Sequence, residues 1–147
     1  MKLINFAWHG ILILLLVNGG AFAQASDDLG AAEALSANQA GKLTLIDIRT
    51  PGEWRETGVP VGARQINMVH PQGAEGFVSQ LLSEIKGDRN APIALICRTG
   101  NRSTQVQRYL QSAGFTRVYN IKEGMAGSAA GIGWIKRGLP VENCTRC

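Results

Sequence analysis

The sequence predicts an α/β domain in which helices flank a central, mostly parallel sheet. Apolar runs with strand composition, at residues 43–48 and 92–96, alternate with segments of helical periodicity. Nearly every position in these two runs is apolar, which is typical of strands that a parallel sheet buries on both faces. Ligands of such sheets bind beyond the carboxyl ends of the strands, so functional residues are expected to follow strand ends.

Length and composition indicate one folded domain. The chain has 147 residues, of which 45% are hydrophobic, an ordinary share for a globular protein. The formal net charge of +4 is spread along the chain without a basic run. We therefore expect no nucleic-acid binding and at most a weak preference for small anions.

The first 23 residues have the features of a secretory signal peptide. Lys2 gives a basic start, residues 11–17 are fully apolar, and Ala21 and Ala23 supply the small residues of a cleavage site. A retained membrane anchor is the alternative, but the apolar run is shorter than the roughly 20 residues that span a bilayer. We therefore expect a periplasmic or secreted protein, without membrane contact after cleavage.

The first half of the mature chain contains a short helix with a clear start signal. A loose leader is predicted over residues 24–34 and the folded domain over residues 35–141. After the strand at residues 43–48, Thr50 can cap a helix, with proline at the first helical position and Glu53 completing a capping box. The other elements expected before the second strand are a short helix over 31–40, a short strand over 62–67, a loop at His70 and an amphipathic helix over 74–86.

The second half repeats the strand-helix-strand pattern and ends in a short tail. Here the predicted elements are a strand over 92–96, a helix over 103–113, a strand over 117–121, a glycine-rich loop over 124–133, a helical turn over 134–137 and a cysteine-containing tail over 142–147.

The segment with the clearest chemistry joins the second strand to the following helix. It reads Cys97-Arg98-Thr99-Gly100-Asn101-Arg102-Ser103. Backbone N–H groups, a helix N-terminus and two arginines place positive potential around the cysteine and favour its nucleophilic thiolate. We predict Cys97 as the catalytic residue and the next six residues as the substrate-binding loop. The alternatives are a buried structural cysteine, and arginines that are solvated or paired with Asp47 or Glu53.

Two other classes of cysteine enzyme fit the sequence less well. His70 is the only histidine after the signal peptide and is not well placed as a general base, so a Cys-His hydrolase is poorly supported. Four residues separate Cys97 from Arg102, one fewer than in tyrosine-phosphatase-like loops. A smaller loop suits a sulfur atom carried on the cysteine better than a phosphate ester.

The chain resembles the single-domain rhodanese-like sulfurtransferases over nearly the whole of residues 35–141. The resemblance depends on the order and spacing of several segments rather than on one motif. They are Leu45-Ile46-Asp47-Ile48-Arg49 with Glu53-Trp54, Gly62-Ala63 with Ile66-Asn67, the Cys97–Ser103 loop, Ala113-Gly114-Phe115 with Val118-Tyr119-Asn120, and Trp134 with Gly138-Leu139-Pro140-Val141.

This resemblance implies a thiosulfate sulfurtransferase that needs no cofactor. Cys97 would take the outer sulfur of thiosulfate, or of a similar anionic donor, as a persulfide and pass it to cyanide, to a thiol or to a protein acceptor. Asp47 and Arg49 would brace the active-site region. A sulfur carrier or sensing module without turnover is the alternative. The chain departs from the family pattern at residues 58–61, where the usual histidine is missing, and in its long glycine-rich loop.

The cysteine count leaves the tail with two interpretations. Cys97, Cys144 and Cys147 make an odd number, so in an oxidising compartment at least one of them must stay free, pair between molecules or be modified. The plain interpretation of Cys144 and Cys147 is a local disulfide. The alternative is a redox pair that reduces or accepts the sulfur of Cys97, or that makes the chain a thiol-disulfide redox protein. No metal site is expected, because zinc needs about four ligands and no second cysteine pair exists.

Overall fold

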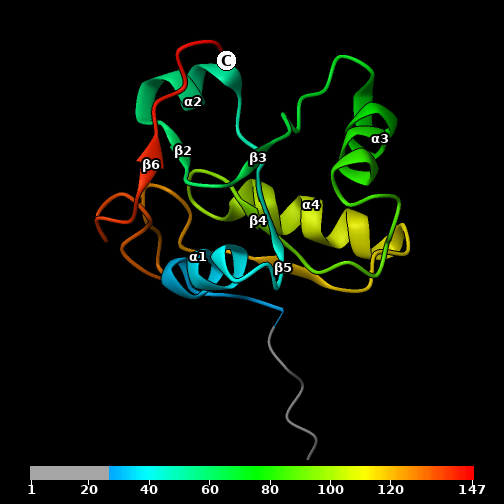
Figure 1. Ribbon diagram of the computed structural model, residues 1–147, viewed down its shortest axis with the longest axis horizontal. Coiled ribbons are helices and arrows are strands. Elements are labelled where there is room, and N and C mark those ends of the chain that lie inside the picture. The colour runs from blue at the N-terminus through cyan, green and yellow to red at the C-terminus, as the bar shows by residue number, and fades with distance from the viewer. Residues whose placement is uncertain (1–26) are drawn as a thin grey trace, which may run out of the picture.

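The computed structural model describes residues 27–147, and the predicted signal peptide lies outside them. The central sheet has four parallel strands in the order β3-β1-β4-β5. The strands are β1 (Thr44–Asp47), β3 (Arg64–Gln65), β4 (Ile93–Ile96) and β5 (Val118–Asn120). The predicted α/β class is therefore confirmed, and both long apolar runs form neighbouring strands in the middle of the sheet (Figure 1).

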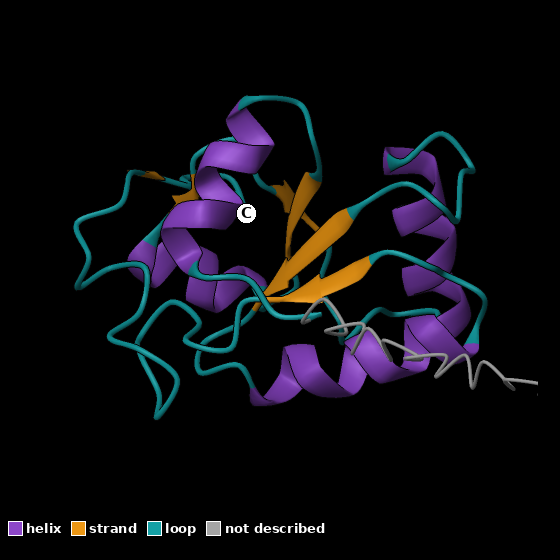
Figure 2. Ribbon diagram, turned by 90° about the horizontal axis from the view of Figure 1, so that it is seen from below, coloured by secondary structure: helices purple, strands orange, loops and turns teal. Residues whose placement is uncertain are grey.

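Helices lie on both sides of this sheet (Figure 2). They are α1 (Ala31–Gln39), α2 (Pro51–Thr57), α3 (Gly73–Glu84) and α4 (Asn101–Ser112). The capping box predicted for α2 is present, because Thr50 Oγ1 accepts the Glu53 N–H and the Thr50 N–H donates to Glu53 Oε2. The predicted helix over 74–86 ends earlier, at Glu84, and Lys86 and Gly87 both adopt positive φ.

Alternating residues of the central strands supply two separate cores. Ile46, Ile93 and Leu95 pack with α3 and α4 residues such as Leu81 and Leu110, and all five are fully buried. The intervening strand residues form the second core, on the side of α1 and the segment after β5. This core contains Leu45, Ala94 and Ile96 of the strands, with Ala34, Met125 and Trp134 packed against them. The absence of a polar face on β1 and β4 follows from this double burial.

The fold begins before the predicted boundary at Leu35. Asp27 and Leu29 exchange backbone hydrogen bonds with Asn120 of β5, at 2.9 and 3.0 Å. Ala31 and Ala34 are fully buried in the core on the α1 side. From Asp27 onward, the predicted leader over 24–34 is therefore part of the domain. The helix expected from residue 31 is present as α1, whereas Asp27 and Leu29 gave no strand signal because their partner is on a strand about 90 residues away.

A second, two-stranded sheet was not predicted. In it, β2 (Val59–Pro60) pairs antiparallel with β6 (Val141–Glu142). Each strand has only two residues, too few for a periodic pattern, and one of the four residues is proline. This pairing fixes the start of the cysteine-containing tail beside α2, where the chain ends in Figure 1. Within residues 27–147, no helix is long and apolar enough to cross a membrane.

Candidate active site

Cys97 lies where β4 ends and the loop to α4 begins, and its side chain is fully buried. Its Sγ accepts hydrogen bonds from the N–H groups of Gly100 and Ser103, at 3.2 and 3.5 Å. Ser103 Oγ lies 3.3 Å from the same sulfur and also donates to the Gly100 carbonyl. The sulfur therefore accepts from two backbone N–H groups at the N-terminus of a twelve-residue helix, a position that stabilises negative charge.

The back of the loop rests on the segment that follows β5. The N–H groups of Met125 and Ala126 donate to the carbonyls of Cys97 and Arg98, both at 2.9 Å. Gly100 has a φ of +86°, and a Cβ at this position would lie 2.1 Å from the Lys122 carbonyl oxygen. The start of the glycine-rich segment thus supports the cysteine loop, and glycine at 100 permits both the turn and the close approach.

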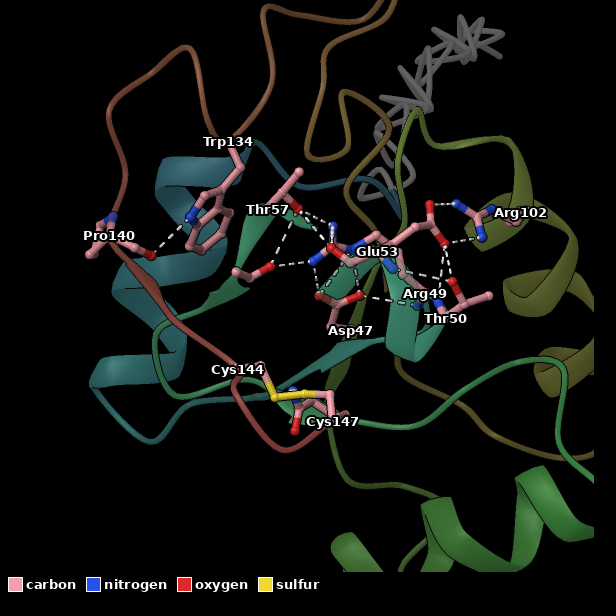
Figure 3. A network of polar contacts seen from close by, with 12 residues as sticks. Asp47, Arg49, Thr50, Glu53, Thr57, Arg102, Trp134, Pro140, Cys144 and Cys147 are labelled. Atoms are coloured by element: carbon pink, nitrogen blue, oxygen red, sulfur yellow. Dashed lines mark hydrogen bonds and ion pairs between the residues drawn. A yellow bond between two sulfur atoms is a disulfide. The ribbon is translucent and has the colours of Figure 1, made fainter. Parts of the chain in front are cut away.

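The two arginines of the loop have different surroundings. Arg102 makes a two-pronged ion pair with Glu53 of α2, with N–O distances of 2.5 and 2.8 Å. The hydrogen bond from Arg102, helped by those from Thr50, lowers the pKa of Glu53 to about 2 despite its burial, and Glu53 in turn raises the pKa of Arg102. Of the alternatives open for Arg102, the ion pair with Glu53 is the one present (Figure 3).

Arg98 is exposed, and its side chain makes no hydrogen bond or ion pair within residues 27–147. It lines a small cavity of about 60 Å³ together with Arg49, Glu53 and Met125. Thr99 and Asn101 lie instead at the edge of a wider depression of about 510 Å³ in front of the glycine-rich segment. Arg98 is therefore the loop arginine whose charge is not neutralised by a carboxylate.

Asp47 and Arg49 form a buried ion pair beneath α2. Arg49 Nη2 lies 2.6 Å from Asp47 Oδ2, and both residues are at most 1% exposed. The rest of the guanidinium donates to Thr57 Oγ1 and to the Gly58 carbonyl, each at 2.7 Å, as Figure 3 shows for the threonine. This network ties the end of β1 to the C-terminal end of α2, and Glu53 of the same helix holds Arg102 of α4.

His70 is committed to a local turn. Its Nδ1 accepts the Gln72 N–H at 3.1 Å, just before α3 begins. Within residues 27–147, the hydrogen-bond partners of Cys97 Sγ are Gly100 and Ser103, and no histidine is among them. The geometry therefore offers Cys97 backbone N–H donors and a neighbouring hydroxyl rather than an imidazole base.

Glu123 is a structural residue that the sequence analysis missed. It is 4% exposed and accepts hydrogen bonds from Ala31 N, Gly133 N and Arg137 Nε, at 2.9, 2.9 and 2.7 Å. Burial opposes its ionisation, but these donors together outweigh burial and lower the pKa of Glu123. Its carboxylate caps α1 and closes the glycine-rich segment. No sequence signal marks it, because Ala31 is 92 positions away.

The tail cysteines form a disulfide with each other, which is the plain interpretation of the C-x-x-C motif. Gln65, the last residue of β3, donates its side-chain N–H to both sulfurs, at 3.2 and 3.0 Å. Arg55 of α2 donates to the Cys147 carbonyl. Figure 3 shows the disulfide between the tail cysteines. Cys97 is left as the free thiol of the described chain. No cluster of three or more His, Cys, Asp or Glu side chains suited to a metal ion occurs in residues 27–147.

Proteins similar to this chain include a sequence relative and two solved structures. A sulfurtransferase of Allochromatium vinosum is 34% identical over 99 residues, which cover 67% of this chain and 78% of the relative. A crystal structure of a Mycobacterium tuberculosis protein superimposes with a TM-score of 0.63 at 28% identity, covering 80% of this chain and 97% of that one. The polysulfide-sulfur transferase of Wolinella succinogenes, at 24% identity, shares the fold with a TM-score of 0.59 over 82% of each chain.

The profile of the rhodanese-like domain matches residues 30–130. This match spans most of the chain and includes the β1 strand, the Cys97 loop and the supporting segment after β5. It begins before α1, in agreement with the early start of the fold. The chain therefore belongs to the rhodanese-like family of sulfur-transfer proteins.

Proposed function

We propose that the protein is a thiosulfate sulfurtransferase that works through a persulfide on Cys97. The observation that carries the proposal is the pair of backbone donors at Cys97 Sγ, the N–H groups of Gly100 and Ser103, with the Ser103 hydroxyl 3.3 Å from the same sulfur. A persulfide is an anion at neutral pH, and these donors with the helix N-terminus stabilise such a charge in a buried position.

The first half-reaction is a displacement at sulfur. The Cys97 thiolate attacks the outer sulfur of thiosulfate, the S–S bond of thiosulfate breaks, and sulfite leaves with the bonding electron pair. Arg98, whose charge no carboxylate offsets, attracts the dianionic donor to the loop. Glu53 and Arg102 hold the far side of the loop in place.

The second half-reaction returns the enzyme to its starting state. A thiophilic acceptor attacks the outer sulfur of the persulfide, and Cys97 leaves as a thiolate. Cyanide would yield thiocyanate, and a thiol would yield a new persulfide. Asp47 and Arg49 contribute by fixing the end of β1 against α2, and neither needs to touch the substrate.

Mass spectrometry of the protein after incubation with thiosulfate tests this function. We expect a gain of about 32 Da, the mass of one sulfur, with release of an equal amount of sulfite. Cys97→Ser should show neither, and its thiocyanate production should fall on the order of 1,000-fold or more. Ser112→Ala, at the far end of α4, serves as the matched control. An adduct that forms but is not discharged by cyanide or thiols would indicate a carrier instead, and no adduct would contradict the proposal.

Export to the periplasm or secretion is the second part of the proposal. It is supported by the apolar run over residues 11–17 and by the small residues before position 24, which lie outside the described residues. Fractionation of a bacterial host that expresses the full sequence should yield a periplasmic protein beginning at Gln24, whereas a chain lacking residues 1–23 should stay in the cytoplasm. Recovery of the uncleaved chain in the membrane fraction would identify an anchor.

A further inference from the structure

The disulfide of the tail and the Cys97 loop lie at the same edge of the sheet. Gln65, which donates to both tail sulfurs, is in register with Asp47 of β1, and Asp47 is in register with Ile96 of β4. Cys97 is the next residue after Ile96. The residue that docks the tail and the nucleophile are therefore at nearly the same level of the sheet, separated by one intervening strand. Their side chains lie on opposite faces, because Ala63 and Ile96 belong to one core and Ile66 and Cys97 to the other. With neighbouring strands about 4.8 Å apart, this separation is about 10 Å.

A reduced tail has the length to cover this separation. The pairing of Glu142 with Val59 anchors the chain two residues before Cys144. The five residues from Glu142 to Cys147 extend by up to about 17 Å once the disulfide is open, which exceeds the separation of about 10 Å. Cys147 must leave Arg55 and pass the end of β1 to make this movement. Both tail cysteines are partly exposed, so their release from this position disrupts no core packing.

We propose that the reduced Cys144–Cys147 pair is a built-in acceptor that releases the sulfur of Cys97 as sulfide. This inference rests on the proposed persulfide on Cys97. Its observations are the docking of the pair at the edge of β3, its register with Cys97 and the reach of the tail. In the Cys97 persulfide, the outer sulfur lies one S–S bond, about 2 Å, beyond the buried Sγ. The Cys147 thiolate therefore has to contact only this outer sulfur.

The chemistry needs two thiolate displacements. Cys147 thiolate attacks the outer sulfur of the Cys97 persulfide; the bond between that sulfur and Cys97 Sγ breaks, and Cys97 leaves as a thiolate. Cys144 thiolate then attacks Sγ of the Cys147 persulfide, so the tail disulfide forms and hydrosulfide leaves. One sulfane sulfur gains two electrons and the dithiol loses two. An external dithiol reductant is required to reopen the disulfide for another turnover.

The tail offers a suitable setting for this exchange. Arg55 of α2 donates to the backbone oxygen of Cys147 and holds this residue beside α2 while the disulfide is closed. Gln65 donates to both sulfurs and holds them together when the disulfide closes. The described structure corresponds to the state after sulfide has been released, with Cys97 free and the tail oxidised.

A single-turnover experiment on the full chain tests the proposal. The protein is reduced with dithiothreitol, separated from it without oxygen, and mixed with thiosulfate alone. With thiosulfate at a fixed excess, we expect one equivalent of sulfide and two of sulfite per chain, with loss of all three free thiols, because Cys97 is loaded a second time after the tail has been oxidised. The rate constant should not change when the protein is diluted tenfold, because the acceptor is on the same chain. Protein that keeps its tail disulfide should release sulfite and no sulfide.

Single variants locate each step. Cys147→Ser should retain the added sulfur on Cys97, whereas Cys144→Ser should carry it on the tail peptide, with no sulfide from either. Wild-type protein that gains the Cys97 adduct but releases no sulfide would overturn this inference while leaving the sulfurtransferase function intact. A rate proportional to protein concentration would also overturn it, because the acceptor would be another chain. If wild-type protein and both variants gain no sulfur, the proposed function itself fails.

Discussion

The Cys97 loop and the Cys144–Cys147 tail both present sulfur at the edge of the same sheet, but they are held in different ways. The loop is supported from beneath by β4, from behind by the segment after β5 and at its rim by Glu53. The tail has a two-residue strand pairing, one glutamine and one arginine contact. Backbone hydrogen bonds and buried packing fix a nucleophile, whereas a few exposed side-chain contacts leave an acceptor free to move.

The largest effect is expected where the loop meets its support. Gly100→Ala should cost about 3 kcal/mol or more of stability, because alanine would be strained at a φ of +86° and its Cβ would collide with the Lys122 carbonyl. Gly87→Ala is the matched control, since Gly87 has a φ of +78° and no atom within 4 Å of its Cβ position. It should cost about 1–2 kcal/mol in urea unfolding. Equal losses would show that the close approach to Lys122 contributes nothing.

A smaller effect is expected at the rim of the loop. Glu53→Gln keeps an acceptor for the cap of α2 but removes the charge paired with Arg102, so we expect a loss of about 1 kcal/mol at pH 7. The pKa of Glu53 is lowered from 4.5 to about 2 in the folded state. The pair therefore stabilises the fold fully above about pH 4.5, and this contribution is lost as the pH falls toward 2.

Unfolding measured between pH 7 and pH 2 separates this contribution from the others. The difference in stability between wild type and Glu53→Gln should shrink as the pH falls from 4.5. Glu84→Gln removes the more exposed ion pair with Arg64 and should change stability by less than about 0.5 kcal/mol. A constant difference between Glu53→Gln and wild type across this range would mean that the charge of Glu53 is not what stabilises the loop.

The smallest effect on stability is expected at the tail. Gln65→Leu removes the donor to both sulfurs and should cost less than about 1 kcal/mol, because thiol and disulfide sulfurs are weak acceptors. Reduction of the disulfide by dithiothreitol should become up to about fivefold faster, the factor that corresponds to 1 kcal/mol. The control is Gln111→Leu on α4, which removes a side-chain contact with Asp27, far from the tail. An unchanged reduction rate would show that Gln65 does not hold the tail.

Local signals predicted the parts of the site that depend on neighbours in sequence. The apolar runs gave β1 and β4, and the Thr50-Pro51-Gly52-Glu53 segment gave the cap of α2, which the structure contains. The position of Cys97 between a strand and a helix likewise followed from composition on either side. Helix ends were less accurate: α4 begins at Asn101 rather than at Ser103, because Gly100 itself supplies the turn.

Contacts between distant residues had no such signal. Glu53 was one of two candidate partners for Arg102, and only the packing of α2 against the loop selected it. The joining of Glu123 to Ala31, the addition of Asp27 and Leu29 to β5 and the pairing of β2 with β6 were not predicted at all. Each depends on a polar group that finds its partner only after the chain has folded.

The sequence by itself therefore determined the α/β class, the order of the central elements and the identity of the cysteine at the strand end, because hydrophobic periodicity and capping residues are local properties. The tertiary structure decided which arginine of the loop is neutralised, what supports the loop from behind and where the tail disulfide docks. These depend on which surfaces meet when the sheet is assembled. The placement of Gln65 level with Ile96, one strand apart from it, is the clearest example, since 31 positions separate them in the chain.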